Sequence, residues 1–314
     1  MNPQLSIIIV NYNGENVLDQ CFNSIKKFIN CSHEIILVDN ASSDDSLALI
    51  KNKFPYVHII ENTTNLGFAT GNNIGVKNAK GDFLLLLNND TRLTNSIFPA
   101  IELLKSNEEI GVIGGLLKYQ NGKIQPSYGY FHSPIRIVFS WLSTNKNKWF
   151  PSTLKRIETD ISKYTEGKEV DWVSGAFLLT RKTVWGKING MDERYFMYVE
   201  DVDFCKRANY IGYKTIYSNK ISAVHYVRAR KSYIDFLSLI YTSKSYLIYI
   251  EKFHSRNWII FVKLGLGFVF LIRGFIYSVM NLLQIKNDKK RKVGIIYFKT
   301  AFLLLTNKLK STNA

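Results

Sequence analysis

Two periodicities alternate along the first hundred residues, and this alternation limits the folds open to the chain. Residues 5–10, LSIIIV, form an unbroken apolar run typical of a strand buried on both faces, whereas apolar residues recur at helical spacing over 15–29. Two more strands are predicted at 34–40 and 56–60, with a short helix over 47–54 between them. This order predicts an α/β fold with a mostly parallel central sheet, in which ligands bind beyond the carboxyl ends of the strands.

Short polar residues follow three of the predicted strands. They lie at 11–14 (NYNG), at 39–43 (DNASS) and at 88–90 (NND), the last directly after the four leucines 84–87. Such residues also make turns and helix N-caps, and that role stays open for 42–44. Three polar strand ends at one edge of a sheet nevertheless favour a ligand site there.

A glycine-rich segment, 62–82, precedes the leucine strand, and its small residues would let the backbone approach a ligand closely. The segment contains no GxxxxGK[ST] sequence, and no GxGxxG follows the first strand. The absence of these motifs therefore argues against a P-loop NTPase and against a dinucleotide-binding protein.

The charge and the cysteines narrow the partners and the compartment. The 314 residues carry a formal net charge of +16, which favours an anionic partner such as nucleic acid, a phosphorylated ligand or an acidic membrane surface. Cys21, Cys31 and Cys205 lack metal-type spacing, and we expect them to be reduced. The N-terminal sequence lacks a basic region and its apolar run is too short for a signal peptide, so we expect the chain to begin in the cytosol.

Six segments in a fixed order give the chain a resemblance to a known family. They are IIIVNYN, ILVDNASSD, NLGFATGNNIGVKNAKGDFLLLLNND, VSGAFLLTRK, GMDERYFMYVEDVDFCKRANYIGYK and AVHY. Together they span 4–230 and resemble the inverting family 2 glycosyltransferases, most of all the rhamnosyltransferase-like branch. The resemblance implies a GT-A type nucleotide-sugar-binding fold, a nucleotide-diphosphate sugar donor lying across the strand ends, and a divalent cation, Mg²⁺ or Mn²⁺, on its diphosphate.

The resemblance also implies the donor contacts. Asp39 would contact the nucleoside, with a helix N-cap as the alternative role for this residue. The segment 67–73 would lie against the donor. The expected nucleotide- and donor-binding residues are Asn11, Tyr12, Asn13, Asp39, Asn40, Gly67, Asn72 and Asn89.

Asp90 is the metal ligand that the resemblance implies. It stands at the last position of the family's Asp-x-Asp motif, which here begins with Asn88. One carboxylate suffices where substrate phosphates supply other ligands, but an amide is a weaker ligand, so we expect low metal affinity without nucleotide. His225 stands where related sequences carry a histidine that completes the metal or diphosphate site, and a structural histidine is the alternative.

Four acidic residues, Glu193, Glu200, Asp201 and Asp203, lie at or just before the start of a predicted helix that ends at Tyr210. The helix dipole favours acids there, so a structural role is the alternative for each of them. In the resembling enzymes the Asp of the Glu-Asp pair is the general base. The resemblance therefore implies that Asp201 removes the acceptor's hydroxyl proton and that Glu200 orients the base or the acceptor. One base opposite the leaving diphosphate gives inversion.

The composition changes after residue 232. We predict a catalytic domain over 1–232, with a nucleotide-binding half at 1–95 and an acceptor-side half at 96–232. We expect the basic and apolar helical region 233–314 to associate with an anionic membrane surface. The basic cluster at 228–231 would neutralise phosphate charge or face lipid headgroups.

Lys263 and Arg273 interrupt the apolar stretch 258–283, and the uncharged interval between them is too short to span a bilayer. We therefore expect this stretch to lie in the membrane interface, followed by the basic segment 286–292 and the apolar segment 293–305. A helix packed on the catalytic domain and a pair of true spans are the alternatives.

These features predict a transferase at the cytoplasmic face of the cell membrane. We expect it to move a sugar, with rhamnose from dTDP-rhamnose as the candidate, to a saccharide or lipid-linked saccharide acceptor in cell-surface polysaccharide biosynthesis. A UDP- or GDP-linked hexose donor is one alternative, and a non-enzymatic membrane or nucleic-acid-binding protein is another. Basic residues gather in the C-terminal third beside apolar helices, so we expect no nucleic-acid partner.

Overall fold

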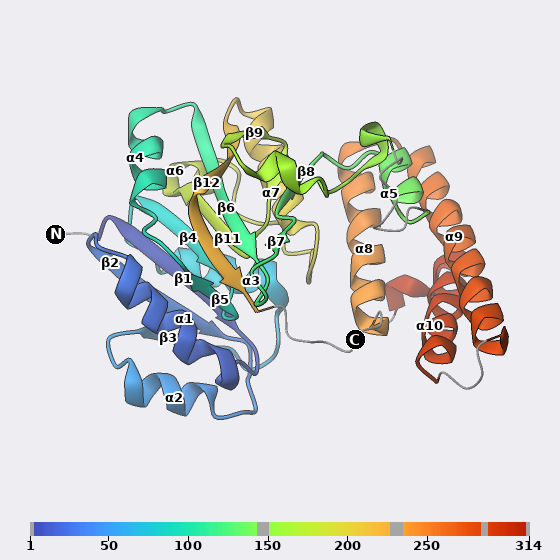
Figure 1. Cartoon of the computed structure of the whole chain (residues 1–314), viewed down its shortest axis with the longest axis horizontal. Helices are drawn as coiled ribbons and strands as arrows, with labels where there is room; N and C mark the ends of the chain where they lie inside the picture. Colours follow the sequence, from blue (N-terminus) through green and yellow to red (C-terminus); the bar gives the residue numbers. More distant parts are fainter. Residues whose placement is uncertain (1–2, 143–150, 227–234, 284–287, 312–314) are drawn as a thin grey trace. The chain divides into compact units, whose positions relative to one another are not determined.

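The computed structural model describes residues 3–142, 151–226, 235–283 and 288–311 (Figure 1). The chain divides into two compact units. The first unit comprises 1–131, 157–196 and 200–228, and the second comprises 132–156, 197–199 and 229–314. The second unit takes in segments from within the expected catalytic domain, and the division at residue 232 stays a prediction.

The N-terminal half of the first unit has the predicted alternation of strands and helices. Its elements are β1 (Leu5–Asn11), α1 (Glu15–Phe28), β2 (His33–Asp39), α2 (Ser46–Lys53), β3 (His58–Glu61), α3 (Gly67–Lys77) and β4 (Phe83–Leu87). The four strands are parallel to their neighbours, in the order β3-β2-β1-β4. Parallel pairing brings the polar segments that follow these strands to one edge of the sheet.

The rest of the first unit extends this sheet. Its elements are β5 (Thr91–Leu93), α4 (Phe98–Ser106), β6 (Ile110–Lys118), β7 (Ile124–Gln125), β8 (Tyr128–Gly129), η2 (Ile161–Tyr164), β9 (Lys168–Val170), β10 (Trp172–Val173), β11 (Phe177–Arg181), α6 (Lys182–Lys187), α7 (Glu200–Tyr210) and β12 (Lys214–His225). The strand order is β3-β2-β1-β4-β11-β6-β12-β5. Since β11 is antiparallel to both β4 and β6, the sheet is parallel over the N-terminal half and mixed beyond it.

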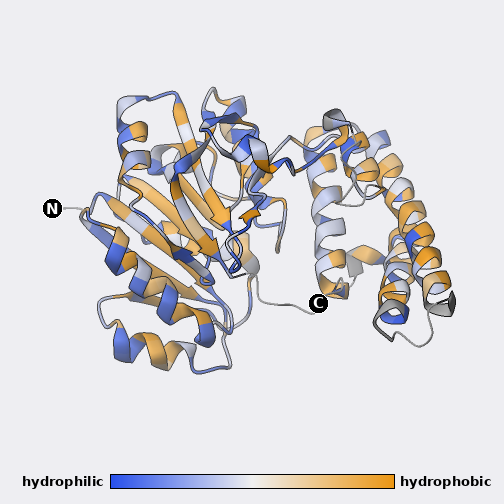
Figure 2. Ribbon diagram, viewed as in Figure 1, coloured by the Kyte–Doolittle hydropathy of each residue, from blue (hydrophilic) through white to orange (hydrophobic). Residues whose placement is uncertain are grey.

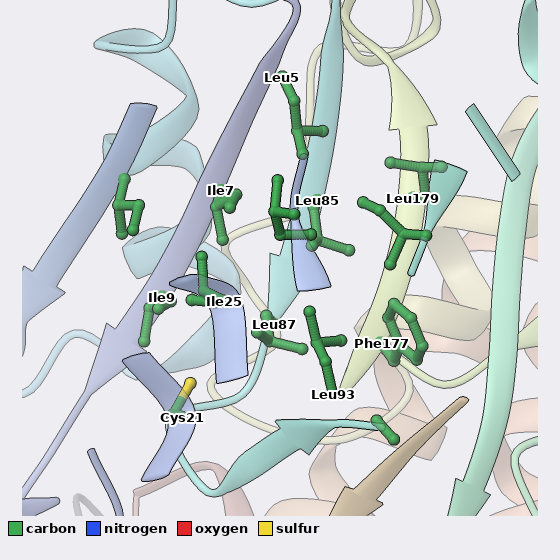
Figure 3. Close-up of a cluster of buried hydrophobic side chains, with 14 of the residues drawn as sticks. Leu5, Ile7, Ile9, Cys21, Ile25, Leu85, Leu87, Leu93, Phe177 and Leu179 are labelled. Atoms are coloured by element: carbon green, nitrogen blue, oxygen red, sulfur yellow. The ribbon is translucent and has the colours of Figure 1, made fainter. Parts of the chain in front are cut away.

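The apolar run of β1 is explained by burial on both faces. Leu5, Ile7 and Ile9 pack in one cluster with Cys21 and Ile25 of α1 (Figure 3). Leu85 and Leu87 of β4 and Phe177 of β11 continue this cluster. Alternate residues of a strand face opposite sides, so Ile8 and Val10 point to the other face, where α3 packs.

Two glycines of α3 have a packing role that differs from the expected one. A Cβ atom added at Gly71 would lie 2.8 Å from a methyl carbon of Val10, and one at Gly75 would lie 2.4 Å from a methyl carbon of Ile8. Both glycines therefore allow α3 to approach β1 closely. The expectation that these small residues serve the approach of a ligand is corrected at these two positions, because a neighbouring strand fills the space.

We expect Gly75→Ala to lower the free energy of unfolding by about 1–3 kcal/mol, because the added methyl group overlaps Ile8 in a packed core. Denaturant unfolding measures this change. The control is Gly186→Ala in α6, where an added Cβ meets no atom within 4 Å and the helix favours alanine by up to about 1 kcal/mol. Equal stability of the two variants would contradict the close packing of α3.

The second unit is helical. Its elements are α5 (Pro134–Ser140), η1 (Ser152–Leu154), α8 (Phe236–Phe253), α9 (Arg256–Leu283), α10 (Asp288–Leu305) and η3 (Lys308–Ser311). Helices α9 and α10 pack antiparallel, since Gly267 lies against Leu305 and Gly274 lies against Phe298. The absence of side chains at these glycines lets the two helices approach closely.

One face of α9 is apolar and exposed. It carries Ile260, Leu264, Phe268 and Phe275, whose exposed fractions range from 54% to 65%. Figure 2 shows hydrophobic residues along most of this helix. The segment Arg256–Met280 is long and apolar enough to cross a membrane by length and composition, a criterion that core helices of soluble proteins also meet.

The two cations that interrupt the sequence of α9 do not interrupt its exposed face. The Arg273 guanidinium donates hydrogen bonds to the Trp141 carbonyl oxygen (2.7 Å) and to the Tyr297 hydroxyl (3.1 Å). Lys263 donates to the side-chain oxygen of Asn307. Both cations, which led the sequence to disfavour a membrane span, thus have hydrogen-bond partners within the unit. Whether 258–283 lies on a membrane stays a prediction.

Candidate active site

Asn11 joins the carboxyl ends of three neighbouring strands. Its buried side-chain amide donates to Asp39 Oδ1 (2.8 Å), Ser42 Oγ (3.1 Å) and Ser46 Oγ (3.1 Å). Its Oδ1 accepts a hydrogen bond from Asn89 Nδ2 at 2.7 Å. The network thus connects β1, β2 and the segment after β4. Asn11 and Asn89 are brought together as expected for one site, and their contact with a donor stays a prediction.

Asp39 is buried and forms a tight turn. Its Oδ1 accepts from the hydroxyl of Ser42 (2.6 Å), and its Oδ2 accepts from the backbone N–H of the same residue (2.8 Å). The N-cap of α2 is Asp45, so Asp39 is not the helix cap that was its alternative role. This turn holds the polar strand end in place, and the nucleoside contact of Asp39 stays a prediction.

The neighbouring donor residues differ in exposure. Tyr12 is 49% exposed, which leaves its ring open to stacking. Asn13 has a positive φ of 53° and accepts a hydrogen bond from Ser43 N. Asn40 is buried and donates to the carbonyl oxygen of Gly67 at 3.0 Å. Of these predicted residues, Tyr12 presents the largest free surface for a nucleoside base.

Gly67 begins α3 in a conformation that glycine alone adopts readily. Its φ is +83°, and an added Cβ would lie 2.4 Å from the carbonyl oxygen of Phe196. That oxygen also accepts a hydrogen bond from Phe68 N at 2.8 Å. In the next turn, Asn72 is buried and donates to the Phe68 carbonyl oxygen, while its Oδ1 has no hydrogen-bond partner among the described residues.

The predicted metal residues meet at the end of β4. Nε2 of His225 lies 3.1 Å from Asp90 Oδ1 and 3.3 Å from Asn88 Nδ2. The pairing of β5 with β12 sets this contact, because His225 lies opposite Thr91, the residue after Asp90. Asn88 Oδ1 and Asp90 Oδ1 are buried and have no hydrogen-bond partner within the described part of the chain.

These atoms fit a divalent cation. Two buried oxygens without hydrogen bonds beside an imidazole nitrogen supply the ligand types that Mn²⁺ accepts, and substrate phosphates commonly complete such a shell. No group of three or more His, Cys, Asp or Glu side chains in the described ranges is arranged to hold a metal. The fit therefore depends on the amide of Asn88 and on ligands from a substrate.

Gln125 is a site residue that the sequence did not reveal. Its side-chain amide lies 3.1–3.2 Å from Nδ1 of His225, on the side of the ring away from Asp90. A partner on one ring nitrogen fixes the tautomer and directs the other nitrogen toward a metal. Gln125 belongs to a two-residue strand and to no motif, so no signal in the sequence could have identified it.

Asp201 is held by two backbone N–H groups. Oδ2 accepts from Gly175 N at 3.0 Å, and Oδ1 accepts from Val202 N at 2.8 Å. Burial raises the pKa of Asp201, while these hydrogen bonds oppose the rise. Its neighbour Glu200 is buried, and Glu200 Oε2 has no hydrogen-bond partner among the described residues.

Glu200 and Asp201 differ in how readily they ionise. Burial, and then the charge of Asp201, raise the pKa of Glu200 well above its ordinary value. Two backbone N–H groups favour the ionised form of Asp201, whereas Glu200 Oε2 has no hydrogen-bond partner among the described residues, so Asp201 is the better placed of the two to act as a general base. The residues before the pair, Tyr198 and Val199, both have positive φ angles, of 72° and 70°. A positive φ angle is unusual for a β-branched residue such as Val199, and backbone strain of this kind clusters at functional sites.

The other two acids have visible structural partners. Asp203 is fully buried, and its Oδ2 pairs with Arg207 Nε at 2.6 Å. Glu193 accepts a hydrogen bond from Asn73 Nδ2 at 2.9 Å. The structural alternative thus describes Asp203 and Glu193, whereas Asp201 contacts the backbone at the start of β11.

The start of β11 connects the base to the metal residues. Gly175 N donates to Asp201, and the carbonyl oxygen of the next residue, Ala176, accepts from Asn88 N at 3.1 Å. A Cβ added at Gly175 would lie 3.1 Å from the ring of Phe68 at the start of α3. Three predicted segments, 67–68, 88–90 and 200–201, therefore meet around two consecutive residues.

We expect Glu200→Gln to raise the melting temperature by a few degrees at about pH 8 and to change it little near pH 4. A carboxyl group with a raised pKa in the folded state stabilises the fold below its ordinary pKa, and this stability is lost as the pH rises through the raised value. The neutral amide avoids that loss. Thermal unfolding of both proteins across this pH range tests the prediction, with Glu169→Gln at an exposed position of β9 as the control. A pH-independent difference would contradict the raised pKa.

The remaining predicted features are placed as follows. Cys21, Cys31 and Cys205 are free thiols, in agreement with the reduced state expected for them. Burial raises the pKa of Cys205 to about 12, which makes its thiol unreactive. The basic cluster of Arg228, Arg230 and Lys231 lies outside the described residues.

Known proteins are similar to this chain in sequence. N-acetylglucosaminyl-diphospho-decaprenol L-rhamnosyltransferase of Mycobacterium tuberculosis is 26% identical over 278 residues, which cover 82% of this chain and 87% of that protein. A low-salt glycan biosynthesis hexosyltransferase of Haloferax volcanii is 22% identical over 262 residues, 78% of this chain and 77% of that protein.

A solved structure supports the fold. A mannosyltransferase from Pyrobaculum calidifontis in complex with GDP-Man and Mn²⁺ superimposes with a TM-score of 0.53 at 12% identity, covering 100% of this chain and 77% of that one. The GT-A type α/β fold expected from the sequence is thereby confirmed. The family model described as "Glycosyl transferase family 2" matches residues 6–181, more than half of the chain. The protein therefore belongs to glycosyl transferase family 2, and its activity is the transfer of a sugar.

Proposed function

We propose that the protein is an inverting, divalent-metal-dependent rhamnosyltransferase. It moves rhamnose from a nucleotide-diphosphate donor, dTDP-rhamnose, to a lipid-linked saccharide in cell-surface polysaccharide biosynthesis at the cytoplasmic face of the membrane. The observation that carries this proposal is the similarity over 82% of the chain to a relative named for rhamnosyl transfer to a diphospho-decaprenol acceptor. The geometry around Asp201 supports the type of reaction.

Asp201 acts on the acceptor. Its carboxylate, fixed by the N–H groups of Gly175 and Val202, takes the proton of the acceptor hydroxyl. The acceptor oxygen forms a bond to the anomeric carbon as the bond from that carbon to the diphosphate oxygen breaks, and the nucleoside diphosphate leaves with the electron pair. A single displacement of this kind inverts the anomeric centre. The raised pKa of Glu200 disfavours a second charge beside the base.

Asn88, Asp90 and His225 are the residues that would hold Mg²⁺ or Mn²⁺. A bound cation supplies Lewis-acid stabilisation of the charge on the departing diphosphate. Gln125 orients the imidazole of His225 through Nδ1. Because only Asp90 is a carboxylate, these residues bind the cation weakly until the donor is present.

The donor lies over the strand ends on the N-terminal side. Tyr12, the exposed aromatic residue after β1, stacks on the nucleoside base, and Asp39 lies beside the nucleoside. The hydrogen bonds among Asn11, Ser42 and Asn89 keep these two strand ends in fixed positions. In this arrangement 1–95 holds the nucleotide and 96–232 supplies the acceptor side.

The exposed face of α9 provides the membrane contact. Phe268→Glu combined with Phe275→Glu is expected to move the full-length protein from the membrane fraction to the soluble fraction, because both side chains are about two-thirds exposed and apolar. The control is Phe98→Glu in α4, which replaces an exposed phenylalanine of the first unit. Retention of the double variant on membranes would refute this contact.

A hexose from a UDP- or GDP-linked donor is the second candidate, favoured by the similarity over 78% of the chain to a relative named as a hexosyltransferase. Turnover of dTDP-rhamnose, UDP-glucose and GDP-mannose with Mn²⁺ and a lipid-diphosphate acceptor distinguishes the two. The proposal expects turnover of dTDP-rhamnose and inversion of its anomeric centre. Turnover of a hexose donor alone would show that the protein is a hexosyltransferase and not a rhamnosyltransferase.

A further inference from the structure

A groove of about 860 Å³ lies within the helical unit. Its lining comes from α8, from the first two turns of α9, from the end of α10 and from the residues that follow α10. A volume of this size accommodates a ligand well beyond a single small ion. We call it the basic groove, after its charged residues Lys244, Arg256 and Lys263.

The charges of the basic groove favour an anion. Among the residues that the structure describes, three cations line it, and Glu251 is the one acidic residue in its lining. Lys263 is fixed by its hydrogen bond to Asn307, which also lines the groove. Burial lowers the pKa of Lys244, because its ammonium group is partly removed from water. The net positive charge of the lining is complementary to a phosphate group.

The walls of the basic groove favour an apolar chain. They include Ile248, Ile259, Ile260 and Leu304. Ile260 also begins the exposed apolar face of α9, which continues through Leu264 and Phe268. A ligand with an anionic head in the groove could therefore extend a hydrocarbon chain along α9 without leaving apolar surface. A soluble phosphate or a nucleotide would make no use of this face.

We propose that the basic groove binds the phosphate headgroup of a membrane lipid, with the lipid chain lying along the exposed face of α9. The inference rests on the proposed membrane association and is independent of the donor sugar and of Asp201. It assigns the second unit a specific lipid site in addition to a general apolar contact. Arg256 and Lys263 hold the phosphate, and the isoleucines beside them contact the start of the chain.

The test measures binding of dihexanoylphosphatidylglycerol, a short-chain anionic lipid used below its micelle concentration, to the full-length protein by calorimetry. Dihexanoylphosphatidylcholine is the neutral comparison. The variant Arg256→Gln combined with Lys263→Gln is expected to bind the anionic lipid roughly 10- to 30-fold more weakly, since each cation near an anionic lipid contributes about a factor of five. The matched control, Lys51→Gln combined with Lys53→Gln, removes two exposed cations from α2 and should bind like the unmodified protein.

Three outcomes would overturn the proposal. The groove variant and the control could bind the anionic lipid with equal affinity, or the unmodified protein could show no preference for the anionic over the neutral lipid. The third is complete displacement of the bound lipid by glycerol 1-phosphate, which would indicate a site for free phosphate. Arg256→Lys combined with Lys263→Arg should restore binding, which separates loss of charge from loss of fold. Binding of unmodified protein to phosphatidylcholine vesicles is measured in parallel. If the unmodified protein binds the monomeric lipid but not the vesicles, the membrane contact is rejected. If it binds the vesicles but not the monomeric lipid, the lipid site in the basic groove is rejected.

Discussion

Asp201→Asn is expected to lower kcat by about 10²- to 10⁴-fold, the range that general bases contribute, while leaving affinity for the nucleotide unchanged. The amide keeps the size of the side chain and one of its two backbone contacts, because its oxygen accepts from Gly175 N or Val202 N but its NH2 group cannot accept from the other. The amide also cannot take the acceptor's proton. Single-turnover kinetics with the saturating donor measure the chemical step. Glu169→Gln, at an exposed position of strand β9, removes one negative charge elsewhere in the first unit and should retain full activity.

The pH profile gives a second test of the same assignment. Because burial raises the pKa of Asp201, the acidic limb of kcat/KM should lie above the ordinary range of aspartate, with activity falling as the pH falls through it. Full turnover by Asp201→Asn, or an unshifted acidic limb, would show that another group takes the proton.

Asp90→Ala is expected to abolish the increase in nucleotide affinity that Mn²⁺ produces and to lower kcat/KM by about 10²- to 10³-fold, since Lewis-acid stabilisation is worth several kcal/mol. The substitution removes the carboxylate that faces His225 at 3.1 Å. Calorimetric titration of dTDP with and without Mn²⁺ measures the coupling directly, independently of turnover.

Asp82→Asn is the matched control for this experiment, since Asp82 is an exposed acid at the opposite end of β4. It should show the same metal dependence as the unmodified protein. Gln125→Leu should weaken Mn²⁺ binding by about 10- to 100-fold through loss of the partner that orients His225. If the unmodified protein bound dTDP with the same affinity with and without Mn²⁺, Asp90 would have no metal-binding role.

The α/β order and the outlines of the site were predictable because both depend on short stretches of sequence. Unbroken apolar runs report burial on two faces, which is why the predicted bounds of β1, α1 and β2 differ from the observed ones by at most one residue. The polar residues 88–90 directly follow a strand, and 200–201 begin a helix. The periodicity that predicts these elements therefore also predicts that these residues lie at their ends.

Packing between distant segments was beyond the reach of periodicity. The glycines of α3 had two possible uses, close approach to a ligand or to another element, and only the position of β1 showed that Gly71 and Gly75 serve the second. From the sequence, Arg273 likewise was predicted only to place a charge within an apolar helix. Its bonds to Trp141 and Tyr297, which are 132 and 24 residues away, turn it inward.

The sequence by itself determined the parallel N-terminal sheet, the family and the identity of Asp90, Asp201 and His225 as candidates, because each is encoded in local patterns or ordered motifs. The tertiary structure alone decided that β11 enters the sheet antiparallel, that Gln125 orients His225 from 100 residues away, and that consecutive residues at the start of β11 contact both Asp201 and Asn88. The physical reason is that hydrogen bonds between distant segments depend on which strands pair. Periodicity reports which side of an element is buried, but not what covers it.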